Sequence, residues 1–394
     1  MTAKAKQIQP LSGVKILEFA TLLPGPFAGL MLAAAGAEVM KVERPEGDEL
    51  RGYVPKAGED SLCFALLNRG KRSIAIDLKA PGSIDRLRPL IREADVVIEQ
   101  FRPGVMARLG LGYDALRAIN PRIILCSITG FGQTGPRARI AGHDLNYQAE
   151  AGLLSLTCDR DGVPVLPATL VGDIGAGSLP AVLNILLALR QRDLTGEGAW
   201  LDIGITGNLL TFPYSYLGYG LALDQWPEPG RDRLTGASPR YQLYRTRDGR
   251  YLAAAPIEQR FWDRFCDALD LAEALRDDAA DPEATRRAIG DIIARQDADH
   301  WIALFSGMDV CVTLVKTMQE AASDPDTRAL PPLARQVDTP EGAVPGLYLP
   351  VCAQFLGAAG IGAHPALGED QAALDRSRPV LRAIRRGMRA AHTG

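Results

Sequence analysis

The regular pattern of the chain begins with the stretch Gly13-Val14-Lys15-Ile16-Leu17-Glu18-Phe19. Its β-branched and apolar residues predict a buried strand over 14–19, and similar runs recur at 38–42, 73–76, 95–98 and 123–128. Amphipathic, helical patterns lie between these runs. Strands separated by helices imply right-handed crossovers and a parallel sheet covered on both faces. The first half of the chain is therefore predicted to be a Rossmann-like α/β layer.

The turn after the first predicted strand lacks the glycine pattern of a dinucleotide site. It is Leu22-Leu23-Pro24-Gly25-Pro26, with no G-x-G-x-x-G nearby. That glycine pattern forms the turn that holds the pyrophosphate of nicotinamide cofactors. The sequence therefore argues against a nicotinamide-dependent dehydrogenase.

Length and composition limit the class of protein to which the chain can belong. The 394 residues are enough for at least two domains, and 47% hydrophobic and 23% charged residues with a net charge of -3 are typical of a globular α/β protein without a nucleic-acid partner. The six cysteines are scattered without a C-x-x-C pair, which predicts neither zinc nor disulfides and favours a reducing compartment. The polar N-terminus has no secretory pattern, and the longest apolar run, 179–189, is shorter than the ~20 residues that span a bilayer. We expect a cytoplasmic protein without membrane association.

The second half of the chain has a different pattern. A glycine-spaced segment at 175–178 opens a long apolar helix that we expect to be buried and to end near 190–192. Residues 213–239 have no clear periodicity, and two alternating runs then flank Asp248-Gly249, which predicts a hairpin. Helical patterns follow to about residue 305. The arginine-rich C-terminal tail is predicted to be a solvated helix face.

Three residues are candidates for acid–base chemistry. His143 follows the turn-rich stretch 129–136, and Asp173 directly precedes the glycine-rich helix start. Each has a structural alternative, since a lone histidine is often a hydrogen-bonded loop residue and an aspartate there suits a helix cap. Glu258, at a predicted strand-to-helix junction, has the same capping alternative. A histidine and a carboxylate from separate loops would act as an acid–base pair if folding brings them together, with glycine-rich backbone amides available to an enolate oxygen.

Cations follow or precede several predicted strands. In open α/β sheets, ligands collect at the carboxyl ends of the strands, and a ring of cations there suits a polyphosphate, although each one singly is more often a surface charge. Phe101 is either an adenine-stacking ring or a core aromatic. The cations are Lys41, Arg44, Arg69, Lys71, Arg72, Arg102 and Arg108.

Several motifs in a fixed order resemble family III CoA-transferases over about residues 11–375. They are Leu11-Ser12-Gly13-Val14-Lys15-Ile16-Leu17-Glu18-Phe19, Leu23-Pro24-Gly25-Pro26, Gly36-Ala37-Glu38-Val39, Lys41-Val42-Glu43-Arg44-Pro45, Leu67-Asn68-Arg69-Gly70-Lys71-Arg72-Ser73 and Phe101-Arg102-Pro103-Gly104-Val105.

The resemblance implies a large Rossmann-like CoA-binding domain built from both ends of the chain, a smaller α+β domain between them, and two interlocked chains with active sites at their interface. We expect residues 11–200 to form the first part of the large domain, 201–236 a linker, 237–320 the small domain and 321–394 the segment that completes the large domain.

The resemblance also implies roles for individual residues. Transferases of this family use an aspartate, matched by Asp173, to form an acyl-anhydride, whereas the alpha-methylacyl-CoA racemase branch pairs it with a histidine. His143 stands 30 residues before Asp173, as in the racemases, and Glu258 resembles the glutamate that supports the histidine. Six residues are expected to contact CoA: Leu23, Arg44, Lys71, Phe101, Arg102 and Arg108.

One residue departs from the racemase pattern, and two activities therefore remain possible. Racemases usually have asparagine four residues before the aspartate, where this chain has Thr169, and the surrounding stretch resembles transferases equally well. We expect racemisation of a 2-methyl-branched acyl-CoA through an enolate, with CoA transfer to a free carboxylic acid through Asp173 as the alternative. A CoA-binding regulatory protein is a third possibility. No cofactor is expected beyond the CoA of the substrate, since the thioester acidifies the α-carbon.

Overall fold

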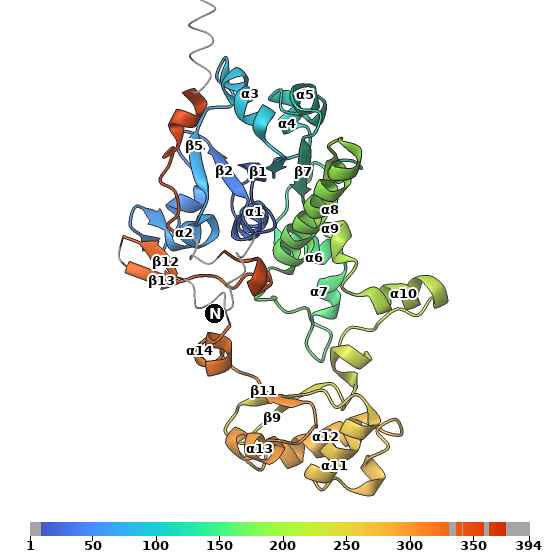
Figure 1. The fold of residues 1–394 in the computed structure, drawn as a ribbon. Coiled ribbons are helices and arrows are strands. Elements are labelled where there is room, and N and C mark those ends of the chain that lie inside the picture. Colours follow the sequence, from blue (N-terminus) through green and yellow to red (C-terminus); the bar gives the residue numbers. More distant parts are fainter. Residues whose placement is uncertain (1–8, 331–335, 341, 358–361, 376–394) are drawn as a thin grey trace, which may run out of the picture. The chain divides into compact units, whose positions relative to one another are not determined.

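The computed structural model describes residues 9–330, 336–340, 342–357 and 362–375, and the chain divides into two compact units (Figure 1). Unit 1 is Met1–Ala151, Thr169–Thr211 and Arg328–Gly394. Unit 2 is Gly152–Ala168 and Phe212–Thr327. The smaller unit thus begins at residue 212 rather than 237 and also takes residues 152–168, and the large unit resumes at 328 rather than 321.

Unit 1 contains a six-stranded parallel sheet of order β5-β2-β1-β6-β7-β8. Five strands confirm the prediction from periodicity. The sixth, β8, pairs with β7 at the sheet edge and was missed, because it lies where the pattern predicts a linker. The strands are β1 (Lys15–Phe19), β2 (Glu38–Glu43), β5 (Arg72–Ala75), β6 (Val96–Glu99), β7 (Ile124–Thr129) and β8 (Trp200–Gly204).

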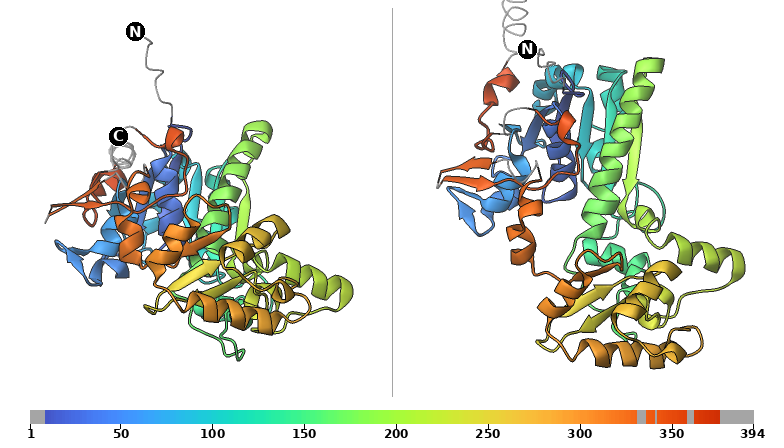
Figure 2. Two further views of the ribbon diagram at one scale, coloured as in Figure 1. Left: turned by 90° about the horizontal axis from the view of Figure 1, so that it is seen from below. Right: turned by 60° about the horizontal axis from the view of Figure 1, so that its bottom comes forward.

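Helices cover both faces of this sheet (Figures 1 and 2). On one face, α3 (Ser83–Glu93) and α5 (Tyr113–Ile119) bury Leu87, Ile91 and Leu116 against strand residues. On the other, α1 (Pro24–Ala34) contacts β1 and β2, and α8 (Leu179–Thr195) contacts β7 and β8. The shorter helices of unit 1 are α2 (Leu62–Asn68), α4 (Val105–Arg108), α6 (Asp144–Glu150) and α9 (Ile205–Leu209).

The sequence predicted a buried helix here, and α8 is buried on one side only. Ala181 and Ile185 are inaccessible, whereas Leu183 and Leu187 are each 58% exposed. Together with the π-helix Val171–Ser178 it forms a continuous stretch of 25 residues that, by length and composition, could cross a membrane. This is weak evidence, because a core helix of a sheet protein passes the same test.

The C-terminal segment joins unit 1 beside β5. The Arg72 guanidinium pairs with Asp370, and the Gln371 amide bonds both backbone groups of Ala75. Two short strand pairs flank this region, β3 (Lys56–Ala57) with β4 (Asp60–Ser61) and β12 (Gln336–Thr339) with β13 (Gly342–Pro345). The arginine-rich tail, residues 376–394, lies outside the described residues.

Unit 2 has a three-stranded antiparallel sheet, β11-β10-β9, covered by helices. The predicted hairpin is present, with Gly249 at φ 82° in its turn. Trp262, Phe265, Ile289 and Trp301 form its core. Its strands are β9 (Gln242–Arg245), β10 (Tyr251–Ala254) and β11 (Val312–Leu314), and its helices are α7 (Leu153–Leu156), α10 (Tyr214–Leu223), α11 (Gln259–Ala268), α12 (Pro282–Ile293), α13 (Ala298–Phe305) and α14 (Met318–Ser323), with α15 (Pro325–Arg328) at the boundary. The predicted linker 201–236 therefore contains most of β8 and all of α9 and α10.

Candidate active site

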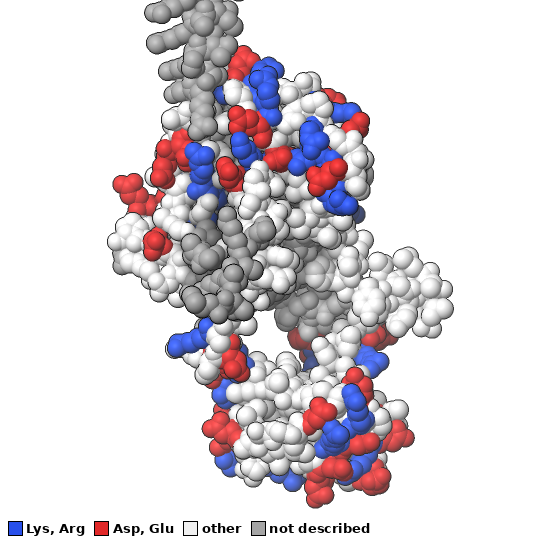
Figure 3. Space-filling view, viewed as in Figure 1, with Lys and Arg blue, Asp and Glu red and all other residues white. Residues whose placement is uncertain are grey.

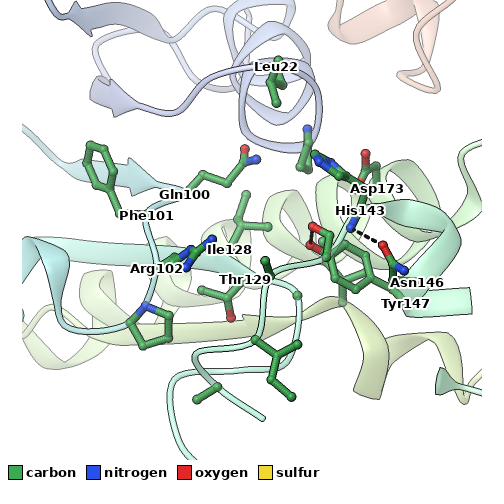
Figure 4. Close-up of a pocket in the computed structure, with 18 residues that line it drawn as sticks. Leu22, Gln100, Phe101, Arg102, Ile128, Thr129, His143, Asn146, Tyr147 and Asp173 are labelled. Carbon is green, nitrogen blue, oxygen red and sulfur yellow. Dashed lines mark hydrogen bonds between the residues drawn. The ribbon is translucent and has the colours of Figure 1, made fainter.

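A cavity of about 470 Å³ lies at the carboxyl ends of β6 and β7, where ligands of open α/β sheets collect. We call it the His143 cavity. Its walls come from the loop after β6, the end of β7, the loop 138–143, α6 and the starts of α1 and the π-helix (Figure 4). Both His143 and Asp173 line it, so folding brings together the two residues that the sequence singled out.

His143 is the N-cap residue of α6, and its side chain is exposed to the cavity. Its backbone N–H donates to Asn146 Oδ1 at 3.0 Å, which fixes the start of the helix (Figure 4). The ring of Tyr147 packs under the loop, and its hydroxyl donates to the carbonyl of Gly142. A side chain at Gly130 would come within 2.3 Å of that ring, so glycine is required where the loop leaves β7.

Asp173 lies inside the π-helix rather than at a helix cap, since Leu170 takes the N-cap position. Its backbone N–H donates to Asp144 Oδ1 at 2.8 Å. Ser178 Oγ lies 3.0 Å from the Asp173 carbonyl and 2.8 Å from that of Pro24, which ties the π-helix to α1. Single π-helical turns occur frequently at functional sites. This geometry places the Asp173 carboxyl at the cavity wall.

The surroundings of Asp173 favour its neutral form. Burial, followed by the nearby Asp144 carboxylate, raises the pKa of Asp173 to about 6, against the opposing effect of His143. A carboxyl with a pKa near neutrality is populated in both protonation states. Such a group is suited to donate and to accept a proton at physiological pH.

Asp144 was not among the predicted site residues. Its side chain is buried, and its two oxygens accept hydrogen bonds from the Asp173 backbone and from Gln148 Nε2. A side chain at Gly172 would collide with Asp144 Oδ1. The spacing of Asp144 and Gln148, four residues apart on a helix, is the signal that was available in the sequence.

A second cavity, of about 660 Å³, lies at the ends of β1 and β2; we call it the Arg44 cavity. Arg44 and Phe101 both line it, and Phe101 also lines the His143 cavity, as does Arg102. Phe101 also packs against the core, as the core-aromatic alternative predicted. Leu23 is the N-cap residue of α1, and Arg108 is exposed at the end of α4. Lys79, which also lines the Arg44 cavity, was not predicted.

The expected CoA contact of Lys71 needs correction. Its side chain is inaccessible, and its ammonium group donates to Glu18 Oε2 at 2.8 Å and to Asn68 Oδ1 at 2.9 Å. Lys41 lies in the same network, 2.8 Å from Asp48. Burial lowers the pKa of Lys71 to about 8. Because its donors point into the protein, Lys71 supports the sheet instead of meeting a phosphate.

Glu258 belongs to unit 2, whereas His143 belongs to unit 1. It is exposed at the N-cap position of α11, where its carbonyl accepts from the backbone of Trp262 but its side chain makes no capping bond. The capping alternative therefore does not explain its side chain. Within the residues that the structure describes, no group of three or more His, Cys, Asp and Glu side chains is arranged to hold a metal ion.

The sequence profile of CoA-transferase family III matches residues 11–371, and the chain therefore belongs to this enzyme family. It is 37% identical over 318 residues to the alpha-methylacyl-CoA racemase of Mus musculus, covering 79% of each chain. It is 34% identical over 396 residues to the succinate–glutarate CoA-transferase of Agrobacterium fabrum, covering 94% of this chain and 96% of that one. A solved CAIB/BAIF family protein from Brucella suis superposes with a TM-score of 0.79 at 32% identity, over 93% of this chain and 98% of the other.

Proposed function

We propose that this enzyme racemises 2-methyl-branched acyl-CoA thioesters by moving the proton on the α-carbon. The observation that carries the proposal is that His143 and Asp173 line one cavity, with the pKa of Asp173 raised to about 6. The protonated carboxyl that the mechanism needs on Asp173 is then populated near neutral pH. Both racemases and transferases occur among its relatives, so the histidine–aspartate pair is what favours the racemase.

The proposed reaction has two proton transfers. His143 takes the α-proton of one enantiomer, and the electron pair of the broken C–H bond moves into the thioester to form an enolate. Asp173 then donates its proton to the opposite face of the planar carbon. The reverse reaction exchanges the roles, so the active pair carries one proton in total.

The lining of the His143 cavity supports an apolar acyl group. Leu22, Ile128, Ile140 and Ile205 contribute to it, and Arg102 is its single Lys or Arg among the described residues. In the transferase alternative, Arg102 is the cation available to the second carboxylate of a dicarboxylic acid. We assign the Arg44 cavity to the nucleotide end of CoA, with Arg44 on a phosphate and Phe101 beside the adenine.

CoA transfer is the second candidate function. Thr169 departs from the racemase pattern, and transferases are found among the relatives at 33 to 34% identity. In that reaction the ionised Asp173 attacks the thioester carbonyl to form an aspartyl-acyl anhydride and releases CoA thiolate. The thiolate then attacks the aspartyl carbonyl, which gives an aspartyl-CoA thioester and frees the first acid. The second acid attacks this thioester to form a new anhydride with Asp173, and the released thiolate attacks its acyl carbonyl to give the new acyl-CoA and restore Asp173. His143 would then be structural.

We propose further that two copies of the chain associate. The outer side of α8 exposes Leu183 and Leu187, and α10 carries no charged residue while Tyr214 and Leu221 are 77% and 74% exposed. Figure 3 shows α10 free of both acidic and basic side chains. Apolar surfaces of this kind mark protein interfaces. An interlocked pair would also let Glu258 of one chain orient His143 of the other.

The six cysteines are all free, which supports a reducing, cytoplasmic location.

Proton NMR in D₂O tests the function. The protein is incubated with (R)-2-methylacyl-CoA, first alone and then with succinate. Loss of the α-proton signal without added acid, abolished in both His143→Ala and Asp173→Ala, is the racemase result. A new CoA thioester that forms only with added acid, and still forms in His143→Ala, would make the enzyme a transferase.

A further inference from the structure

Glu99 is a buried carboxylate that the proposed mechanism does not use. It is the last residue of β6, is 3% exposed, and lies between Phe19 of β1 and Ser127 of β7. A carboxylate is seldom buried this deeply in a central strand without a purpose for its hydrogen bonds. Its partners therefore indicate what it does.

The carboxylate holds the loop that follows it. The Phe101 N–H donates to Glu99 Oε2 at 2.7 Å. Ser127 hydrogen-bonds to the same carboxylate, and Trp200 Nε1 donates to Ser127 Oγ at 3.1 Å. Because the serine oxygen accepts from the indole, its single hydrogen is free for Glu99. Both donors are suited to an ionised acceptor.

The same loop has a second anchor. Gln100 Oε1 accepts a hydrogen bond from the Gly25 N–H at the start of α1, at 3.0 Å. A Cβ atom at position 25 would lie 2.2 Å from Ala20 Cβ, so glycine is required for the start of α1 to lie this close to Ala20. Residues 100–103 all line the His143 cavity, and Phe101 also lines the Arg44 cavity. The loop thus contributes to both cavities assigned to the substrate.

We propose that Glu99 is a positioning residue whose ionised carboxylate holds residues 100–103 in the shape that receives acyl-CoA, and that protonation of Glu99 weakens acyl-CoA binding. The inference rests on the proposed assignment of the two cavities to acyl-CoA. A proton on Oε2 would oppose the Phe101 N–H, donor against donor. Protonation also removes the negative charge that makes the carboxylate a strong acceptor for the Phe101 N–H and the Ser127 hydroxyl.

Glu99 changes its protonation state within the pH range in which binding can be measured. Burial, and to a smaller extent Asp202 of β8, raises the pKa of Glu99 to about 7, against the bonds from Ser127 and Phe101. The other ionisable groups near it are Cys126 on β7, and Arg102 and Asp114, which share a cavity of about 340 Å³ with Glu99 and Trp200. If only the ionised form binds, affinity is constant well above pH 7 and falls about tenfold for each pH unit below it.

Calorimetric titration of CoA between pH 5.5 and 8.5 tests this, with wild type compared against Glu99→Gln and Asp202→Asn. CoA and the other site residues also titrate, so the informative quantity is the difference between variants. Glu99→Gln is expected to bind about tenfold more weakly at pH 8 and to lose the Glu99 part of the pH dependence. Asp202→Asn is expected to bind normally at pH 8 and to move the midpoint to lower pH.

Turnover gives an independent measurement. At pH 8, Glu99→Gln is expected to raise KM about tenfold and to change kcat by less than about threefold, because the variant affects the loop and not the proton-transfer pair. Glu99→Asp, which keeps the charge, should restore part of the pH dependence of binding.

Two results separate the possible failures. If wild-type protein binds no CoA at any pH, the cavity assignment itself is wrong. If wild type binds CoA but Glu99→Gln has the same affinity and pH profile, the role of Glu99 is overturned. Should Glu99→Gln fail to fold, as judged by circular dichroism, an unchanged midpoint in Asp202→Asn would overturn it instead.

Discussion

The backbone N–H of Asp173 donates a 2.8 Å hydrogen bond to Oδ1 of Asp144, the residue that directly follows His143. One buried carboxylate therefore fixes the π-helix that carries Asp173 against the helix that begins at His143. Its negative charge also raises the pKa of Asp173. Position and acidity of the candidate proton donor thus depend on the same side chain.

The pH dependence of turnover distinguishes the two candidate activities. A racemase needs one proton on the His143–Asp173 pair, so kcat/KM for α-proton exchange should pass through a maximum and fall on both sides. A transferase needs ionised Asp173, so its kcat/KM should rise through pH 6 and then remain level. Exchange followed by NMR and CoA transfer followed by chromatography, each from pH 5 to 9, make the comparison. A level exchange rate up to pH 9 would contradict the racemase.

Replacing Asp144 with Asn should lower the pKa of Asp173. The substitution removes the nearby negative charge while its amide oxygen can still accept from the Asp173 N–H, so the pKa should move from about 6 toward 3.8. Carbon-13 NMR of labelled aspartate measures the shift. Glu150→Gln is the control, since it makes the same chemical change on the same helix at an exposed pair with Arg137. An equal shift in both variants would argue against a local effect of Asp144.

Lys71 and Arg44 should respond differently to replacement by Met. Lys71→Met leaves the buried Glu18 with fewer partners and should cost about 3 kcal/mol of stability. Arg44→Met, at a half-exposed side chain, should change stability by less than ~0.5 kcal/mol and weaken CoA binding about tenfold. Urea unfolding and calorimetry measure the two quantities. Weakened CoA binding without loss of stability in Lys71→Met would return Lys71 to the CoA site.

Arginine on the outer side of α8 should prevent association of two chains. Leu183→Arg and Leu187→Arg add charge to an exposed apolar surface without touching the buried Ala181 and Ile185. Sedimentation equilibrium should find wild type as a dimer at micromolar concentration and the double variant as a monomer. Arg88→Glu, at an exposed charged position of α3 on the opposite face of the sheet, is the control. A wild-type monomer at all concentrations would overturn the proposed pair.

Local pattern was enough to predict much of the fold. Alternating β-branched and apolar runs located β1, β2, β5, β6 and β7, because strand and helix periodicities extend over neighbouring residues. The turn residues Asp248-Gly249 located the hairpin of unit 2, since positive φ is a property of the residue itself. The motif around His143 and the glycines after Asp173 were likewise visible, and both residues line one cavity.

Tertiary structure decided what depends on distant parts of the chain. Lys71 has the kind of side chain that binds phosphate. In the folded unit, however, its ammonium group is hydrogen-bonded to Glu18, 53 residues earlier, and points into the protein. The outer side of α8 has the same apolar sequence character as its inner side, and only the position of the sheet decides which residues are covered. The burial of Asp144 and Glu99 is likewise decided by packing against distant parts of the chain. Periodicity is encoded within a few residues, whereas burial and electrostatic partners are set by contacts that form only when the whole unit has folded.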